Sequence, residues 1–425
     1  MFIGKDFLTK VEIERLIDNY ILNEGRTSST QGILDSNAVP RIDKYVVRPG
    51  KVSDSIFGGR GEFTIERKKY EQAIPARPHD VKYFTKEVDG KDKEFAHVEF
   101  ENPPLNAHDG TPLRIMVRTQ RISTHDVNRG EIPFKDQILA SNHNYMRRLL
   151  TPAIGTSQYD VEGLPDNAVV IVSEDLKEDI DFENVLRAYM AKSSTSTSLY
   201  VHYMNGEREF CGHKLPEGLF PNGPLPYVMD TPSTKSAEHD ISVSPEQLFE
   251  MKVCTPEIYS QVRNGSVYAF GKVDEFFRPK GVIAVDTKTE HGINKKGKIV
   301  SKDEIWTMDS SRFWLVDDYN TQIELFLKGK EEELIKYIKE TQPGIKEKEF
   351  IVNGRIVPSP RSLSKEFARG FSEGENGYTD EQRAQIAVRY VEGIQSLLGR
   401  KFEPDLRPRD VRVISGLELA VSIAA

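Results

Sequence analysis

Charged side chains occupy alternate positions near residue 290, at Asp286, Lys288 and Glu290. On a β-strand these three share one face, because successive side chains point to opposite sides. Asp303 follows after a turn, at a separation that lets it meet Glu290 across a strand pair. Two carboxylates brought together, with Lys288 near and Arg312 farther along, suit a hard divalent cation that carries phosphates. A charged, solvated hairpin is the alternative that these residues leave open.

The segments around these residues predict the hairpin that would position them. Residues 281–285, GVIAV, are a short apolar run rich in β-branched side chains, which fits a buried strand. Asn294 to Gly297 supplies a turn, and residues 298–300 begin the returning strand. The sequence therefore predicts that the turn brings the two carboxylates side by side.

Two motifs in this stretch resemble the SAICAR synthetase family, ligases also called phosphoribosylaminoimidazole-succinocarboxamide synthases. The family carries a DTKxEFG strand and then a DEvxTPDSSRfW segment. Here they stand as DTKTEHG at 286–292 and DEIWTMDSSRFW at 303–314. The resemblance implies a magnesium site at Glu290 and Asp303 and a catalytic group of Lys288, Asp309 and Arg312.

Two further motifs concern a nucleotide triphosphate. GKVSD resembles the family's GKVRD, with Ser53 in place of arginine, and TPSTK ends at Lys235. Backbone amides after a Gly-Lys pair could approach a polyphosphate, although an edge hairpin explains that pair equally well. Without the resemblance, TPSTK is a Pro-rich loop. The resemblance implies that Gly50, Lys51, Val52 and Lys235 bind ATP.

Two loops resemble the family's substrate-binding segments. TQRISTHD matches DRISAFD at Arg121, Ser123 and Asp126, and the segment from Arg187 to Ser193 keeps the spacing of a family phosphate-binding loop. A guanidinium fork and a hydroxyl suit phosphate oxygens. Arg121 could instead support its loop through a salt bridge with Asp126. The resemblance implies that the substrate nucleotide contacts Arg121, Ser123, Asp126, Arg187, Ser193 and Arg312.

The chain also departs from the family motifs. The altered positions are Ser53, Gln120, Thr124, His125, Ala188, Lys192, His291, Met308 and Ser364. Their concentration in loops that line the family's pocket suggests a paralogous ATP-dependent amide ligase with a different carboxylated nucleotide or amine. A third hypothesis is an inactive nucleotide-binding relative. The carboxylate pair argues against it, because two adjacent carboxylates repel without a cation.

The composition sets limits on partners and compartment. The net charge of −8 argues against a general nucleic-acid-binding surface. Only Cys211 and Cys254 are present, so no disulfide framework is expected and a reducing cytoplasm is suited. No apolar run reaches the length of a membrane span. We expect small-molecule partners and a monomer or homodimer.

The resemblance implies an α+β fold with a small antiparallel ATP-binding lobe, a larger ATP-grasp-like lobe and C-terminal helices. It also implies that ATP, with Mg²⁺, activates the carboxylate of CAIR, a carboxylated aminoimidazole ribonucleotide, as an acyl phosphate. The amine of aspartate then attacks, giving SAICAR, ADP and phosphate. The expected limits are 1–45 for a helical extension, 46–172 for the small lobe with an insertion at 66–112, 173–320 for the second lobe, and 321–425 for a helical region packed on it.

Local patterns predict several elements. These are a hairpin around the Gly-Gly-Arg-Gly turn at 58–61, strands at 113–117 and 168–172, helices at 134–150, 245–263 and 380–398, and a C-terminal strand or docked segment after residue 410. Thr379 and Gly399 are the expected cap and stop of the helix at 380–398.

Overall fold

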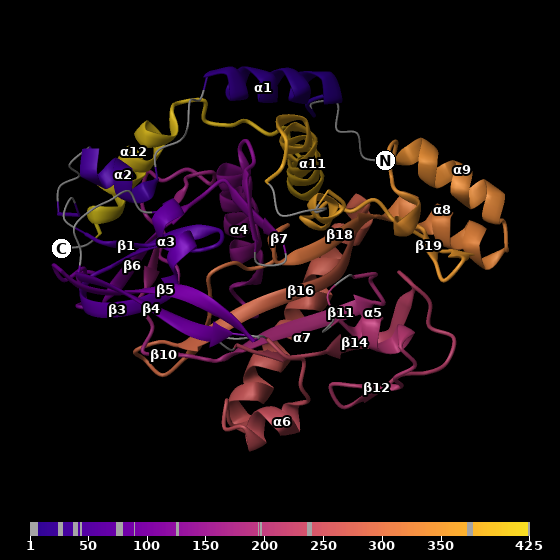
Figure 1. Cartoon of the computed structure of the whole chain (residues 1–425), viewed down its shortest axis with the longest axis horizontal. Coiled ribbons are helices and arrows are strands. Elements are labelled where there is room, and N and C mark those ends of the chain that lie inside the picture. The colour runs from indigo at the N-terminus through magenta and orange to yellow at the C-terminus, as the bar shows by residue number, and fades with distance from the viewer. Residues whose placement is uncertain are drawn as a thin grey trace.

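The computed structural model describes residues 7–23, 29–36, 41–42, 45–73, 80–88, 90–124, 127–193, 195, 198–235, 240–371 and 377–423. The fold is α+β, as expected, and its sheets are built from antiparallel strand pairs. Figure 1 shows the N-terminal sheets on one side of the molecule and the longer central strands beside them, with helices above and below.

The small lobe is centred on a four-stranded sheet in the order β1-β2-β6-β9. Alternate residues of β6 enter an apolar core, at Leu113, Ile115 and Val117, so the opposite face of this strand is left for polar side chains. The strands are β1 (Val47–Arg48), β2 (Ser53–Phe57), β6 (Leu113–Arg118) and β9 (Val170–Glu174).

The large lobe is built on a seven-stranded sheet whose central strand is β16. Its first residues are apolar and fully buried, which anchors the strand and leaves its second half to carry charged groups. The strands are β10 (Glu178–Asp179), β11 (Phe182–Tyr189), β14 (Pro224–Asp230), β15 (Ser233–Thr234), β16 (Val282–Ile293), β17 (Ile299–Lys302) and β18 (Ser311–Leu315).

A three-stranded sheet, β3-β5-β4, occupies the region expected to hold an insertion. The hairpin expected around residues 58–61 is wrong, because β2 pairs with β6 whereas β3 pairs with β5. The chain changes sheets at Gly58, where a β-carbon would lie 2.4 Å from the backbone nitrogen of Leu105. The strands are β3 (Gly59–Glu66), β4 (Asp80–Val88) and β5 (Lys91–Asn102).

Short two-stranded ribbons complete the β structure. They are β7 (Arg121–Thr124) with β8 (Val127–Glu131), β12 (Glu209–Phe210) with β13 (His213–Lys214), and β19 (Ile351–Val352) with β20 (Arg355–Ile356).

Helices cover the sheets, and two of them correct the sequence-based expectations. The helix expected at 245–263 is two helices, because Lys252 adopts a left-handed conformation and Thr255 caps a new helix that begins with Pro256. The C-terminal segment is a helix rather than a strand, and it docks on β9. The helices are α1 (Lys10–Asn23), α2 (Thr30–Ser36), α3 (Arg67–Ala73), α4 (Lys135–Leu150), α5 (Leu199–Met204), α6 (Pro245–Glu250), α7 (Pro256–Phe277), α8 (Val316–Leu327), α9 (Glu331–Thr341), α10 (Glu366–Arg369), α11 (Asp380–Leu398) and α12 (Arg409–Val421).

The caps expected for α11 are confirmed. The Thr379 hydroxyl accepts a hydrogen bond from the Gln382 amide, and the Gln382 side chain returns to the Thr379 backbone. Gly399 ends the helix with φ of 67°, a conformation that favours glycine. No helix among the described residues is long and apolar enough to cross a membrane.

Candidate active site

The hairpin of β16 and β17 brings the two predicted carboxylates together. Glu290 lies opposite Lys302 in the strand pair, and Asp303 follows Lys302 directly, as the sequence predicts. Asp303 has a φ of 56°, so the strand turns sharply at this residue.

The charges of the two carboxylates act on each other. Burial raises the pKa of Glu290, and the negative charge of Asp303 raises it further. Burial also opposes ionisation of Asp303, but Arg114, Lys302 and Lys235 outweigh it and hold the Asp303 pKa below its ordinary value. The two carboxylates therefore repel each other, and a cation bound to both would offset that repulsion.

Each carboxylate has a cationic side chain against it. Lys235 forms an ion pair with Glu290, and an Arg114 nitrogen lies 3.5 Å from an Asp303 oxygen. Lys302 lies 3.9 Å from the Glu290 oxygen. Lys235, which the resemblance assigns to ATP, thus reaches the predicted metal position.

These two carboxylates suit Mg²⁺ bound together with substrate phosphates. Among the described residues, no group of three or more Asp, Glu, His or Cys side chains could hold a metal. Mg²⁺ in nucleotide sites typically takes one or two carboxylates and completes its coordination with phosphates and water. The donor set at Glu290 and Asp303 therefore fits the metal that the resemblance implies.

Lys288 lies on the same face of β16 and pairs with the neighbouring strand. Its ammonium is 2.6 Å from a carboxylate oxygen of Glu183 in β11. Burial lowers the pKa of Lys288, but Glu183 outweighs that effect and the pKa is raised. Lys288 is therefore a fixed positive charge rather than a proton acceptor at neutral pH.

Asp286 lies between two of the predicted phosphate-binding arginines. It pairs in register with Arg187 of β11 on one side and with Arg312 of β18 on the other. Arg312 donates hydrogen bonds to the Asp286 carboxylate from its Nε and Nη2 atoms. Its Nη1 atom donates to the Lys192 carbonyl at 3.1 Å. Arg187 lies 3.6 Å from Asp286. The structure thus brings the two arginines to one point.

Ser193 follows the residue whose carbonyl Arg312 holds. Its hydroxyl accepts a hydrogen bond from the Thr195 amide at 3.2 Å. Arg187 is oriented by a further bond of 3.0 Å from its Nε to the Thr231 hydroxyl. Ser193 thus directly follows a residue that Arg312 contacts, and a hydroxyl beside guanidinium groups is the chemistry that a phosphate monoester requires.

Arg121 supports the Gly50–Lys51 turn. Its guanidinium pairs with the buried Asp54 and donates to the Gly50 carbonyl at 2.8 Å. The neighbouring Val52 carbonyl accepts a 2.8 Å bond from the Thr119 amide. The contacts of Arg121 with Asp54 and with the Gly50 carbonyl favour a supporting role for Arg121 in this turn.

Three other predicted residues of this lobe are placed as follows. Lys51 is exposed, and Ser123 is half-buried in β7. Asp126 lies outside the described residues, as does the altered position His125.

Asp309 is placed differently from the other predicted catalytic residues. Its carboxylate is nearly fully buried, 2.8 Å from the Lys135 ammonium, and accepts a hydrogen bond from the Tyr390 hydroxyl. Burial opposes its ionisation, but Lys135 and Lys365 hold its pKa below the ordinary value. Asp309 thus ties its loop to α4 and α11.

Several departures from the family motifs lie in the core. His291 is on the face of β16 opposite Glu290 and is buried, and burial lowers its pKa to about 4. Met308 is fully buried in the main apolar cluster. Gln120 is also buried and donates to Tyr20 of α1. Lys192 contacts the Lys348 carbonyl.

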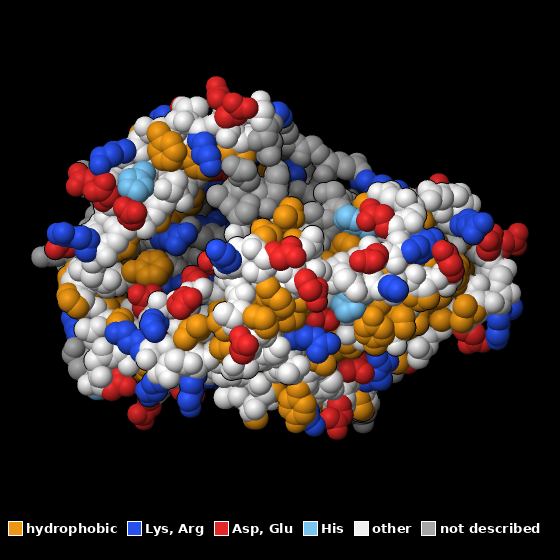
Figure 2. All heavy atoms as spheres, turned by 90° about the horizontal axis from the view of Figure 1, so that it is seen from below, with side chains coloured by type: hydrophobic (Ala, Val, Ile, Leu, Met, Phe, Trp, Pro, Cys, Tyr) orange, Lys and Arg blue, Asp and Glu red, His pale blue; other side chains and the backbone are white. Residues whose placement is uncertain are grey.

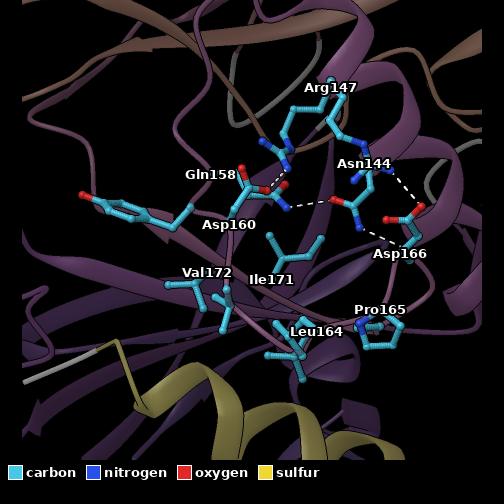
Figure 3. Close-up of a pocket in the computed structure, with 14 residues that line it drawn as sticks. Asn144, Arg147, Gln158, Asp160, Leu164, Pro165, Asp166, Ile171 and Val172 are labelled. Carbon is cyan, nitrogen blue, oxygen red and sulfur yellow. Dashed lines mark hydrogen bonds and ion pairs between the residues drawn. The ribbon is translucent and has the colours of Figure 1, made fainter.

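The surface of the molecule carries mixed charges, and a small polar hollow lies beside α4. Figure 2 shows Lys, Arg, Asp and Glu side chains interspersed over one face, with a hollow beside the N-terminal lobe that has basic side chains on its wall. Figure 3 shows a second hollow beside α4, where Asn144, Gln158 and Asp160 lie near one another. Its volume is about 50 Å³, and its lining residues include the ion pairs of Arg147 with Asp160 and of Arg148 with Asp166. The second hollow has room for only a few water molecules.

Comparison with known proteins identifies the family. Residues 107–334 match the family model described as SAICAR synthetase. The chloroplastic phosphoribosylaminoimidazole-succinocarboxamide synthase of Arabidopsis thaliana is 30% identical over 330 residues, which is 74% of this chain and 70% of that protein. The chain belongs to the SAICAR synthetase family. It is therefore a member of a ligase family of purine biosynthesis.

A bacterial relative and two solved structures agree with this assignment. The synthase of Legionella pneumophila strain Paris is 31% identical over 306 residues, covering 70% of this chain and 86% of the relative. SAICAR synthase from Saccharomyces cerevisiae complexed with SAICAR superposes with a TM-score of 0.54 at 20% identity, over 89% of this chain and 99% of that one. A second SAICAR synthase structure gives a TM-score of 0.55 over the same shares. These structures establish the fold.

Four residues at this candidate site were not among the site residues predicted from the sequence. Asp286 had a signal, because it shares the β16 face with Lys288. Glu183, Arg114 and Lys302 are partners of predicted residues. The first two come from strands far away in the sequence, and no local pattern identifies them.

Proposed function

We propose that this chain joins aspartate to the carboxylate of CAIR at the expense of ATP, giving SAICAR, ADP and phosphate. The observation that carries the proposal is the arrangement on β16. Along one face of β16 lie Asp286, Lys288 and Glu290, in that order. Asp286 has two arginines beside it, and Glu290 has Asp303 beside it. A phosphate-binding end and a metal-binding end thus lie on one rigid element, and the reacting groups belong between them.

Glu290 and Asp303 would hold Mg²⁺, with Lys51 and Lys235 binding the phosphates of ATP. Bound magnesium would neutralise charge on the triphosphate during transfer. Lys235 already reaches this place through Glu290. Gly50 and Val52 would present their backbone to the nucleotide, on a turn that Arg121 supports.

Arg187, Ser193 and Arg312 would bind the 5′-phosphate of the nucleotide substrate. The bidentate pair with Asp286 fixes the plane of the Arg312 guanidinium before substrate arrives. Ser123 would contact the same substrate from β7, and Asp126, which lies outside the described residues, is proposed as a further contact. Lys288 would orient the substrate carboxylate and stabilise negative charge on it.

The chemistry requires activation because a carboxylate oxygen is a poor leaving group. Phosphoryl transfer from ATP to the CAIR carboxylate makes an acyl phosphate, which the aspartate amine then attacks with loss of phosphate. The work of the protein is to position the partners and neutralise charge. Asp309 would act through its loop, since Lys135 and Tyr390 occupy its carboxylate.

Three departures from the family motifs do not favour a different substrate. His291 and Met308 are buried in the core, and Gln120 packs against α1. Side chains in these places cannot contact a substrate. The carboxylate pair likewise gives no support to an inactive relative.

Turnover is the direct test. The protein is incubated with ATP, Mg²⁺, CAIR and aspartate, and ADP and the succinocarboxamide are measured. We expect both products in equal amounts. ADP formation only with other acceptors would overturn the substrate assignment, and no ATP consumption with any acceptor would overturn the ligase assignment.

Glu290→Ala and Asp303→Ala should each abolish turnover and weaken Mg²⁺-ATP binding, and full activity in either would refute the metal site.

The expected domain limits, the cytoplasmic location and a monomeric or dimeric state remain predictions of the same proposal. The Arabidopsis relative is named as chloroplastic, so the compartment of this chain is best tested by locating the protein in its own cells.

A further inference from the structure

One face of the small-lobe sheet is turned toward the carboxylate pair. Leu113, Ile115 and Val117 of β6 enter the apolar core, so Arg114 and Arg118 project from the opposite face. Both reach the large lobe at adjacent residues. Arg118 lies 2.8 Å from Glu304, and Arg114 lies 3.5 Å from Asp303.

The two contacts differ in burial. Arg118 and Glu304 are both well buried and form a closed structural pair. The Arg114 side chain is 16% exposed and the Asp303 side chain 44% exposed, so this contact is buried on the arginine side and reaches solvent on the aspartate side. The longer, partly open pair is the one that a ligand can exchange, because ion pairs that reach solvent contribute less stability than closed ones.

A second arginine lies on the same face. Arg48 of β1 is opposite Ser55, and Ser55 is opposite Met116, which is on the same face of β6 as Arg114. Arg48 and Arg114 therefore lie on the same face of the sheet. The charges of Asp303 and Asp179 act on Arg48.

Each of these guanidinium groups also lies over an aromatic ring. Arg48 is 5.8 Å from the ring centre of Phe63, and Arg114 is 5.7 Å from that of Phe57. Such contacts hold a guanidinium in a fixed orientation while its nitrogen atoms stay available.

We propose that Arg114, with Arg48 beside it, binds the polyphosphate of ATP from the small lobe and exchanges Asp303 for phosphate oxygens when the nucleotide enters. The inference rests on the proposed function and adds two residues to it. A divalent cation at Glu290 and Asp303 repels the cations paired with them, which are Lys235, Lys302 and Arg114. Lys302 keeps Asp179 as a partner at 2.8 Å, whereas Lys235 and Arg114 lose their partner carboxylates. The triphosphate supplies the anions that both can then contact, and a guanidinium fork suits phosphate oxygens.

The alternative is that Arg114 only ties the lobes together. Binding measurements on the full chain separate the two roles. ATP affinity is measured by calorimetry in EDTA, and Mn²⁺ affinity of the nucleotide-free protein by electron paramagnetic resonance. For Arg114→Met we expect metal-free ATP binding to weaken about tenfold or more, since a charged phosphate contact is lost. Mn²⁺ binding should tighten, because Asp303 loses its competing cation.

Two further variants sharpen the test. Arg48→Met should weaken metal-free ATP binding and leave Mn²⁺ binding nearly unchanged. Arg60→Met removes a matched arginine of the same lobe from an exposed pair with Glu101 and should change neither affinity. If Arg114→Met does not fold, Arg48→Met and Arg114→Lys replace it in the test. Both should bind ATP more weakly than the wild type.

The outcomes separate this inference from the proposed function. Wild-type protein that binds no ATP overturns both. Wild-type protein that binds ATP, with Arg114→Met and Arg48→Met binding it equally well, overturns only the role of the arginines. Weaker ATP binding together with weaker Mn²⁺ binding in Arg114→Met indicates a distorted site and also overturns the exchange.

Discussion

At the scale of single residues, the Asp286 carboxylate orients the two arginines of the proposed phosphate-binding site. Arg312 contacts it through two nitrogen atoms, and Arg187 approaches from the other side. Lysine keeps the charge of arginine but lacks the planar fork. We expect Arg312→Lys to raise KM for the nucleotide substrate about tenfold or more with a smaller change in kcat. Steady-state kinetics with each substrate varied would check this.

A matched control for Arg312→Lys is Arg208→Lys. Arg208 also makes a bidentate pair, with Glu217, but on an exposed loop. That variant should keep wild-type kinetics. An unchanged KM in Arg312→Lys, or an equal change in both variants, would contradict the assignment of Arg312.

His291 links a family departure to the pH dependence of stability. Burial lowers its pKa to about 4, and among the described residues its Nε2 has no hydrogen-bond partner. The unfolded chain, with a pKa near 6.5, therefore binds the proton more readily, so stability falls as pH decreases from about 6.5 to about 4. The loss is on the order of 2–3 kcal/mol.

Replacing His291 by the family's phenylalanine should remove this part of the acid sensitivity. We expect His291→Phe to be as active as wild type at pH 7.5, and its unfolding free energy in urea to change less between pH 6.5 and 4.5. Parallel pH profiles for the two proteins would show that His291 does not titrate in this range. Among the described residues the other buried histidine is His143, which stays in both proteins and cancels in the comparison.

At the scale of elements, the sequence predicted those features that depend on contacts between residues close together in the chain. The Asn294–Gly297 turn fixed the β16–β17 register, and Thr379 and Gly399 marked the ends of α11. The placement of Lys288 and Glu290 on one face of β16 followed from their spacing. These parts depend on neighbours in the sequence, so a sequence pattern can identify them.

Other features depend on partners far along the chain. Glu183 meets Lys288 only because β11 pairs with β16, and Arg114 meets Asp303 across the two lobes. The separation of β2 from β3 is decided by their partners β6 and β5. The apolar residues after 410 suggested a final strand or a docked segment, and the second alternative is correct, because β9 offers an apolar surface that a helix covers.

The docking of α12 predicts opposite effects for two helical glycines. A β-carbon at Gly416 would lie 2.7 Å from a methyl group of Val170 in β9, whereas one at Gly271 in α7 would meet nothing within 4 Å. Gly416→Ala should destabilise the protein by about 1–3 kcal/mol through overpacking. Gly271→Ala should stabilise it by up to about 1 kcal/mol, because alanine is the better helix former. Urea unfolding would measure both, and the same sign for both would contradict the docking.

At the scale of the whole molecule, Arg118 and Glu304 join the two lobes through a buried ion pair of 2.8 Å. Thr307 also donates to Glu304 at 3.0 Å, so the carboxylate is held from both sides. Removing one partner of a buried pair leaves the other charge without compensation. We expect Arg118→Met to lower the unfolding free energy by about 3–5 kcal/mol.

The double variant Arg118→Met/Glu304→Gln should recover part of that loss, because no uncompensated charge then remains. The mode of unfolding is also informative. Both tryptophans, Trp306 and Trp314, belong to the large lobe, so their fluorescence reports on that lobe while far-UV circular dichroism reports on the whole chain. The two signals should coincide in wild-type urea unfolding and separate in Arg118→Met, since the lobes lose a buried connection. Coincident curves in the variant, or no recovery in the double variant, would show that other contacts couple the lobes.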